Sequence, residues 1–141
     1  MASLSDVRVR DVLLHGTRTG KIAWVAADGA PHVAPIWFVI DGDDIVFNTG
    51  ADTGKGRALA RDGRASFVVD DQMPPYSFVK IDGSITLHDD LDEVRRLATI
   101  IGGRYMGPDR AEEYGERNGV PGELVVRLHP SKITAVFDIA D

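Results

Sequence analysis

One loop in the first half of the sequence combines glycines, a threonine and basic side chains in an order that suits anion binding. Gly50 directly follows a predicted strand, Thr53 precedes a predicted helix, and Lys55 and Arg57 lie in the first turn of that helix. A threonine there caps the helix, glycines let a ligand approach the backbone, and unpaired N–H groups favour negative charge. The spacing predicts a phosphate or carboxylate site. The alternative is an ordinary strand-to-helix loop with an exposed basic face.

The same loop does not meet the requirements of a nucleoside triphosphatase. In the Gly-x-x-x-x-Gly-Lys-Ser/Thr pattern, a hydroxyl after the lysine binds magnesium. Here Gly50 and Gly54 are one residue too close together, and Gly56 follows Lys55. A simpler anion site, without a nucleotide-bound metal, is the prediction that remains.

The charge distribution favours a small anionic ligand over a polyanion. The chain of 141 residues has a formal net charge of −6, which argues against general nucleic-acid binding. Residues 53–64 nevertheless carry a local balance of +3, because they include Lys55, Arg57, Arg61 and Arg64 against Asp62. Such a basic island suits one small anion, and the alternative is that these cations simply face solvent.

Other kinds of catalytic site have little support. The chain has no cysteine, and its four histidines form no pair at i, i+2 or i, i+4, so no metal site is predicted. No serine stands in a Gly-x-Ser-x-Gly setting, so a hydrolase is not supported. His32 lies beside an apolar strand and either faces a pocket or is hydrogen-bonded at the surface. Trp24, Trp37 and Phe38 form either a wall for a planar ring or simply part of the core.

The composition is that of one globular domain. Apolar residues make up 43% of the chain, and this length allows a single core, so one domain over residues 1–141 is expected. No apolar run is long enough to span a bilayer. The first residues mix acids with bases and lack the apolar run of a signal peptide. A cytoplasmic protein without membrane association is therefore expected.

Apolar periodicity and turn residues predict six or seven strands and four helices. The expected helices span residues 4–14, 55–61, 89–106 and 110–117, and the expected strands span 21–27, 33–40, 45–49, 64–70, 76–87, 123–129 and 132–138. Ser5 is the expected cap of the first helix, and Asp89 or Asp90 that of the longest one. Because short hairpins join most strands, we expect a mainly β fold with flanking helices and a barrel without free sheet edges.

Three local signals shape the expected sheet. Asp28-Gly29 between two apolar runs predicts a hairpin turn. Pro35 cannot donate to a strand ladder, so the strand 33–40 is expected to carry a bulge or to lie at an edge. Apolar residues on both alternations of that strand predict that both its faces are covered. Gly83 predicts a bulge within the strand 76–87.

Taken together, these segments resemble the pyridoxamine 5′-phosphate oxidase-like split-barrel superfamily, which binds flavin or deazaflavin cofactors, and most of all its small F420-dependent oxidoreductases. The resemblance covers nearly the whole chain. Its motifs are Asp28-Gly29-x-Pro31-His32-Val33, Pro35–Phe38, Ile45–Gly50, the run from Thr53 to Ser66, Pro74–Gly83, Arg104–Gly107 and Val125–Ile133. The fold that it implies is a six- to seven-stranded antiparallel split β-barrel of the FMN-binding type.

The resemblance also implies a homodimer with two cofactor sites at the interface. The cofactor-binding residues that it indicates are Pro35, Ile36, Trp37, Asn48, Thr49, Thr53, Lys55, Arg57 and Ser77. Pro35, Ile36 and Trp37 would lie along the ring system. Asn48 and Thr49 would lie near its polar edge, and the basic loop would hold a phosphate or an acidic tail. Tyr76 and Ser77 would come from the neighbouring wall. His32 and Tyr76 are the candidate proton donors, and solvent is the alternative.

The implied activity is that of an F420-dependent oxidoreductase, in which reduced deazaflavin delivers a hydride to an electrophilic carbon of a conjugated small-molecule substrate. FMN is the alternative cofactor. FMN-binding relatives often carry adjacent Arg and Lys in this loop, whereas here Gly54 stands before Lys55. A phosphodiester with a glutamate tail suits a spread basic groove, so F420 is favoured. The remaining alternative is a non-catalytic protein that binds F420 or flavin.

Overall fold

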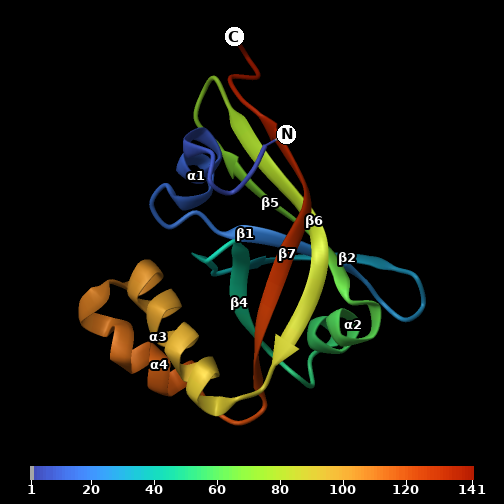
Figure 1. Ribbon diagram of the computed structural model, residues 1–141, viewed down its shortest axis with the longest axis vertical. Coiled ribbons are helices and arrows are strands. Elements are labelled where there is room, and N and C mark those ends of the chain that lie inside the picture. Colours follow the sequence, from blue (N-terminus) through green and yellow to red (C-terminus); the bar gives the residue numbers. More distant parts are fainter. Residues whose placement is uncertain (1) are drawn as a thin grey trace.

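A computed structural model describes residues 2–141 and shows a seven-stranded antiparallel sheet that curls around a core, with four α-helices beside it (Figure 1). The helices are α1 (Val7–Leu14), α2 (Gly54–Asp62), α3 (Leu91–Met106) and α4 (Ala111–Asn118), with a 3-10 turn at Pro108–Arg110. The strands are β1 (Gly20–Val25), β2 (Pro31–Ile36), β3 (Val39–Asp41), β4 (Asp44–Gly50), β5 (Arg64–Asp71), β6 (Ser77–His88) and β7 (Glu123–Val136). The predicted mainly β fold is confirmed. None of the helices described is long and apolar enough to cross a membrane.

The strands follow the order β2-β1-β5-β6-β7-β4-β3 across the sheet. Strands β2 and β3 are consecutive in the chain but occupy opposite edges, so the sheet must curl for the short link Trp37–Phe38 to join them. Within residues 2–141, no ladder pairs β2 with β3. The split barrel is therefore confirmed, whereas the expectation that closure removes every free edge is wrong.

Helix α3 explains why the predicted strand 33–40 is two strands. The backbone N–H of Phe38 donates to the Tyr105 hydroxyl at 3.2 Å, and its carbonyl accepts from the Arg104 guanidinium at 2.6 Å. Arg104 also donates to the carbonyls of Leu13 and Gly16. Because these side chains occupy the groups that a ladder would use, the chain turns from one sheet edge to the other at this point.

Strand β2 is an exposed edge strand. It pairs with β1 on one side only, which confirms the edge position predicted from Pro35. Its side chains Pro31, His32, Val33 and Pro35 are exposed, and Val33 keeps 67% of its surface accessible. The expectation that both faces of this strand are covered is therefore wrong for the single chain.

The last two predicted strands form one strand, β7, which pairs with β6 over most of its length. The register shifts between Asp82 and Gly83, which confirms the predicted bulge. A Cβ at Gly83 would overlap the backbone carbonyl of His129. Glycine is therefore required because the two backbones approach closely, and the long strand bends here without ending.

The helix caps largely follow the sequence. Asp6, not Ser5, caps α1, because its carboxylate accepts from the backbone N–H of Arg8 at 3.0 Å. Asp90 is the cap of α3, and Thr53 caps α2 as predicted. Both of the latter positions precede an uninterrupted helical pattern, which makes the cap readable from local sequence alone.

Two apolar clusters lie on opposite faces of β4. Ile45 and Phe47 belong to the core inside the barrel, whereas Val46 belongs to a second cluster with Val125 and Leu97 of α3. Because side chains alternate along a strand, Asn48 continues the face that points toward α3. This face of β4 and β7 is the floor on which the candidate site is built.

Candidate functional site

A hollow of about 260 Å³ lies between the helix-facing side of β4, the end of β2 and the helices α3 and α4. It is lined by Ile36, Trp37, Asn48, Ile101, Asn118 and Glu123. We call it the Trp37 hollow. Ile36, Trp37 and Asn48 were predicted to bind a cofactor, so the fold brings the predicted ring wall and one predicted polar side chain together.

The indole of Trp37 is held by two tyrosines. It stacks on Tyr105 with ring centroids 5.1 Å apart and an interplanar angle of 2°, and Tyr114 packs against it at 57°. The Tyr105 hydroxyl donates to the carbonyl of Arg18 at 2.8 Å, and burial raises the pKa of Tyr105. The hydrogen bond anchors the Tyr105 ring, and the stacked ring fixes Trp37 at the wall of the hollow.

The basic loop next to the hollow is organised by Thr53. Its hydroxyl accepts from the backbone N–H of Gly56 at 2.9 Å and donates to the carbonyl of Gly50 at 2.8 Å. The predicted role of this hydroxyl as a donor to a ligand therefore competes with an internal hydrogen bond. The N–H groups of Gly54 and Lys55 have no partner within the helix, and the space around Gly54 is open.

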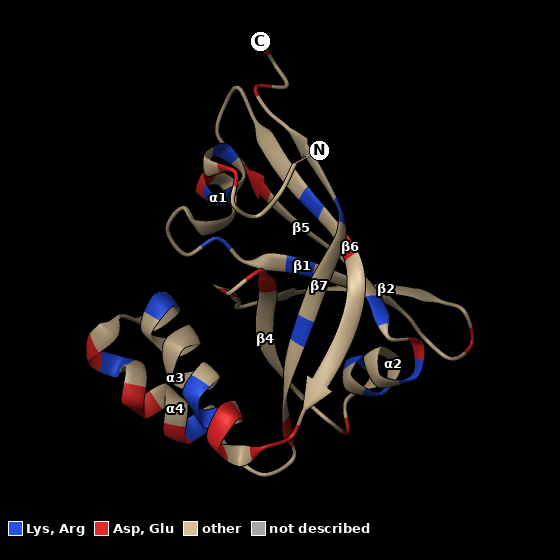
Figure 2. Cartoon of the chain, in the orientation of Figure 1, with Lys and Arg blue, Asp and Glu red and all other residues tan. Residues whose placement is uncertain are grey.

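The predicted basic island contributes one available cation to this loop. Arg57 turns back and donates to the backbone carbonyl of Asp52. Arg61 pairs with Asp62 and donates to the carbonyl of Val25 at 2.7 Å, so it holds α2 against β1. Lys55 is half-buried, and burial lowers its pKa. Figure 2 shows that α2 carries basic residues, and Lys55 is near the hollow because it interacts electrostatically with Glu123, which lines it.

Glu123 is a site residue that sequence reasoning missed. It begins β7 directly opposite Gly50 of β4, and its Oε2 atom is buried without a hydrogen-bond partner. Burial raises the pKa of Glu123, and the positive charge of Lys55 opposes that shift. In the described chain no ion pair within 4.0 Å joins Lys55 to Glu123. The one signal in the sequence is that Glu123 precedes buried Val125 by two residues. Because residues two apart share one face of a strand, this spacing places Glu123 on the side of β7 that faces the helices.

Pro35 and Thr49, which were predicted to lie near the ring system, do not line the Trp37 hollow. Thr49 is buried, and strand alternation points its side chain to the barrel side of β4, away from Asn48. Pro35 is exposed on the free edge of β2. The family resemblance implied that both residues lie near the ring, but the facing of each strand separates their side chains from Asn48 and Trp37.

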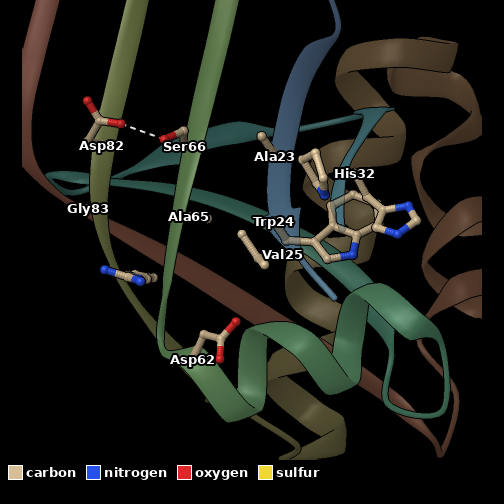
Figure 3. Close-up of a pocket in the computed structure, with 11 residues that line it drawn as sticks. Ala23, Trp24, Val25, His32, Asp62, Ala65, Ser66, Asp82 and Gly83 are labelled. Carbon is tan, nitrogen blue, oxygen red and sulfur yellow. Dashed lines mark hydrogen bonds between the residues drawn. The ribbon is translucent and has the colours of Figure 1, made fainter. Parts of the chain in front are cut away.

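The first candidate proton donor, His32, lies in a different groove. This groove has a volume of about 440 Å³ and runs along β1, β2, β5 and β6 (Figure 3). His32 stacks on Trp24 with ring centroids 5.7 Å apart, and the Ser66 hydroxyl donates to the Asp82 carboxylate nearby. His32 is therefore separate from the hollow that contains Trp37.

The second candidate, Tyr76, lies at the far end of the molecule with Ser77. The turn between β5 and β6 is near the C-terminus, whereas α2 is at the opposite end of the same strands (Figure 1). Strand β5 has eight residues, so the separation is roughly 25 Å. The Ser77 hydroxyl accepts from the N–H of Asp138 at 3.0 Å. One chain thus does not bring Tyr76, Ser77 and Lys55 together.

A polar network ties α3 to the sheet behind the hollow. Arg127 of β7 pairs with Asp41 at 2.6 Å and with Asp44 at 3.1 Å, and Arg96 of α3 also reaches Asp41. These contacts hold α3 against β3, β4 and β7. Among residues 2–141, no group of three or more His, Cys, Asp or Glu side chains is arranged to hold a metal ion.

Comparison with known proteins identifies relatives across nearly the whole chain. A family model described as pyridoxamine 5′-phosphate oxidase matches residues 8–137. A 5a,11a-dehydrotetracycline/5a,11a-dehydrooxytetracycline reductase of Streptomyces rimosus is 32% identical over 127 residues, which cover 82% of this chain and 84% of the relative.

Solved structures show the same fold. A conserved hypothetical protein of Mycobacterium tuberculosis superposes with a TM-score of 0.81 at 22% identity, covering 96% of this chain and 84% of its own. A protein described as an F420 reductase superposes with a TM-score of 0.69 at 21% identity, covering 88% and 94%.

Proposed function

The chain belongs to the pyridoxamine 5′-phosphate oxidase family, and from this premise we propose that it is an oxidoreductase that binds coenzyme F420 and transfers a hydride between that cofactor and a conjugated small molecule. The observation that carries the proposal is the meeting of the Trp37 hollow with the N-terminus of α2. An apolar wall, a polar floor and one half-buried lysine then lie side by side. A planar ring linked to a phosphate needs these three features in this order.

The described residues fit such a cofactor at both ends. Ile36 and Trp37 offer an apolar wall, and the open space around Gly54 lets a phosphate reach the first N–H groups of α2. Lys55 would supply the charge that a phosphate requires. The bound deazaflavin would supply hydride-transfer chemistry, while these residues would orient it and exclude water. The orphaned Oε2 of Glu123 also indicates that the site is incomplete without a ligand.

Redox activity is supported by the curated relative, which is described as a dehydrotetracycline/dehydrooxytetracycline reductase. At 32% identity, that name supports the reaction class, and we propose a conjugated acceptor without specifying it. The F420 reductase is similar in structure at 21% sequence identity, and this similarity supports the fold alone. The choice of F420 rests on the loop itself, where Gly54 takes the place of a second basic residue next to Lys55.

FMN is the second candidate cofactor, and one observation favours it. Arg57 turns back onto the carbonyl of Asp52, so the basic groove is less spread than the sequence suggested. A single lysine and a helix N-terminus suit a compact phosphate monoester. A protein that binds F420 or flavin without catalysis uses the same contacts, and turnover with an acceptor separates it from an enzyme.

We propose further that two copies of the chain form the working unit. The supporting observations are the exposed apolar edge at Val33 and Pro35 and the distance of Tyr76 and Ser77 from Lys55 within one chain. In a homodimer with cofactors at the interface, the Tyr76 turn of one copy would reach the hollow of the other. The proton for the reaction would then come from Tyr76 or from solvent.

The test is a titration of the purified protein with F420 and, separately, with FMN, with Lys55→Ala as the variant. Loss of one charged contact is expected to weaken binding by about 1.5–3 kcal/mol. Arg64→Ala is the matched control. Arg64 is an exposed cation of the same basic island, but it lines the separate groove that contains His32. Tighter binding of FMN would promote the second candidate. Binding of neither cofactor by the wild-type protein would overturn the proposal.

Hydride transfer is checked next with reduced F420 and a panel of conjugated enones and quinones. Oxidation of the cofactor that depends on the acceptor is the expected result. Tight binding without turnover across the panel would favour the non-catalytic alternative.

A further inference from the structure

Glu123 is the one described residue with a buried side-chain oxygen that has no hydrogen-bond partner. A buried polar atom left unpaired costs free energy, and native structures satisfy nearly all such atoms. A carboxylate only accepts hydrogen bonds when ionised. The missing partner is therefore a donor that the described chain does not itself place there.

The position of Glu123 limits where that donor comes from. The side chain lines the Trp37 hollow with Asn48 and Asn118. Its Oε2 atom also lies 3.8 Å from the position of a Cβ built on Gly50, at the start of the basic loop. Glu123 thus belongs both to the lining of the Trp37 hollow and to the surroundings of Gly50, where the basic loop begins.

The neighbouring side chains do not donate a hydrogen bond to Oε2 of Glu123. Asn48 donates to the carbonyl of Leu124 at 3.4 Å, and Lys55 is not within 4.0 Å of the carboxylate. Asn48 and Asn118 add amide groups to the same wall. The hollow therefore combines the apolar side chains Ile36, Trp37 and Ile101 with polar groups that include Glu123.

We propose that the Glu123 carboxylate accepts hydrogen bonds from hydroxyl groups of the bound ligand, and that it thereby selects ligands in which a hydroxylated chain joins a planar ring to a phosphate. This inference rests on the proposed function, because it assumes that the ligand occupies the Trp37 hollow and the α2 N-terminus. F420 and FMN both carry such a chain between ring and phosphate. Glu123 is then a specificity-determining residue for that linker.

The experiment compares ligands that differ only in the linker. FMN and F420 are each titrated beside an analogue in which the hydroxylated chain is replaced by an unsubstituted alkyl chain. Wild-type protein is expected to bind the hydroxylated member of the preferred pair about 10- to 100-fold more tightly, as for a hydrogen bond to a charged group. Glu123→Leu, which keeps the bulk but has no polar atom, is expected to bind both members with the same affinity.

Two further variants separate hydrogen bonding from charge and from folding. Glu123→Gln keeps a neutral acceptor and is expected to retain a reduced preference for the hydroxylated ligand. Glu116→Leu replaces an exposed carboxylate of α4 and is expected to keep the full wild-type preference. A circular dichroism spectrum of each variant checks that it is folded.

The outcomes also distinguish this inference from the proposed function. If wild-type protein binds both members of a pair equally, or if Glu123→Leu keeps the wild-type preference, the inference is overturned while cofactor binding stands. If Glu123→Leu binds all phosphorylated ligands more tightly and keeps the wild-type preference for the hydroxylated member, Glu123 acts through its charge alone and the inference is overturned. If wild-type protein binds no member of either pair, the inference and the proposed function both fail.

Discussion

Burial of the Glu123 carboxylate affects the stability of the folded chain. Burial raises the pKa of this group in the folded state, so the folded protein disfavours the ionised form. Stability is then highest below the ordinary pKa and decreases as pH rises from that value through the folded pKa. Glu123→Gln removes the ionisation. We expect the variant to be more stable than wild type at pH 7 by about 1 kcal/mol, the lower end of the cost of an unpaired buried group.

Urea unfolding at about pH 7 and about pH 4, on either side of the ordinary pKa of glutamate, measures this difference. The gain in the free energy of unfolding should be present at the higher pH and shrink at the lower one. Glu116→Gln, at an exposed carboxylate, should change stability by less than about 0.5 kcal/mol. A loss of stability in Glu123→Gln at neutral pH would show that a donor from the protein reaches the carboxylate in solution.

Single residues of the site were predictable where local sequence determines them. Thr53 could be assigned because a cap depends on its own helix, and Asn48 because the family resemblance indicated it within a strand that local sequence predicts. Glu123 was missed because its role depends on the register of β7 against Gly50, across more than 70 residues of chain. The side chains of Arg57 and Thr49 point away from the predicted site. Their directions depend on the rotamer of Arg57 and on which face of β4 Thr49 occupies, and the residue types alone do not specify either.

The seating of α2 on β4 depends on one glycine. A Cβ at Gly56 would overlap the backbone carbonyl of Gly50, whereas a Cβ at Gly54 would meet nothing within 4 Å. We expect Gly56→Ala to lower the free energy of unfolding by about 1–3 kcal/mol, as overpacking typically does. Gly54→Ala should be neutral or raise stability by up to about 1 kcal/mol, because alanine favours helix.

Thermal unfolding of both variants, followed by cofactor titration, checks this prediction. Gly56→Ala should also weaken cofactor binding, because the first turn of α2 must move away from Gly50. Gly54→Ala leaves the helix undisturbed, so any change in its cofactor affinity reports only on how closely the ligand approaches the backbone at residue 54. Equal stability of the two variants would mean that the loop between β4 and α2 relaxes without cost.

At the scale of elements, local patterns predicted the helices and the number of strands but not where the second strand breaks. Alternation and turn residues place most elements within a few residues of their observed bounds. The break between β2 and β3 is caused by Arg104 and Tyr105, which bind the backbone of Phe38 from α3. These hydrogen bonds join residues that are more than 60 positions apart in the sequence, so the local apolar pattern of residues 33–40 does not predict them.

The whole molecule places its predicted functional residues at two ends. The Trp37 hollow and the α2 N-terminus lie at one end of the long β5–β6 hairpin, and Tyr76 and Ser77 lie at the other (Figure 1). The sequence could predict each group but not their separation, because separation depends on how the sheet curls. A site that uses both groups needs a second copy of the chain, and a twofold arrangement would then form two equal sites.

The homodimer proposal makes a prediction about mixed proteins. Lys55→Ala and Tyr76→Ala each remove one half of every site, so each variant alone should bind cofactor weakly. When the two are co-expressed and assemble at random, half of the dimers are hybrids, and each hybrid has one intact site. About a quarter of all sites should then bind with wild-type affinity, provided that the dimers form from equal amounts of both chains.

Binding stoichiometry of the co-purified mixture measures that fraction, and the two variants mixed after separate purification are the control for slow exchange. Sedimentation first establishes that the wild-type chain is dimeric at the concentrations used. If one chain builds the whole site without Tyr76, Tyr76→Ala should bind cofactor like wild type, Lys55→Ala and the double variant Lys55→Ala/Tyr76→Ala should behave alike, and about half of all sites in an equal mixture should bind with wild-type affinity. That result would place Tyr76 outside the site and assign the proton for the reaction to solvent.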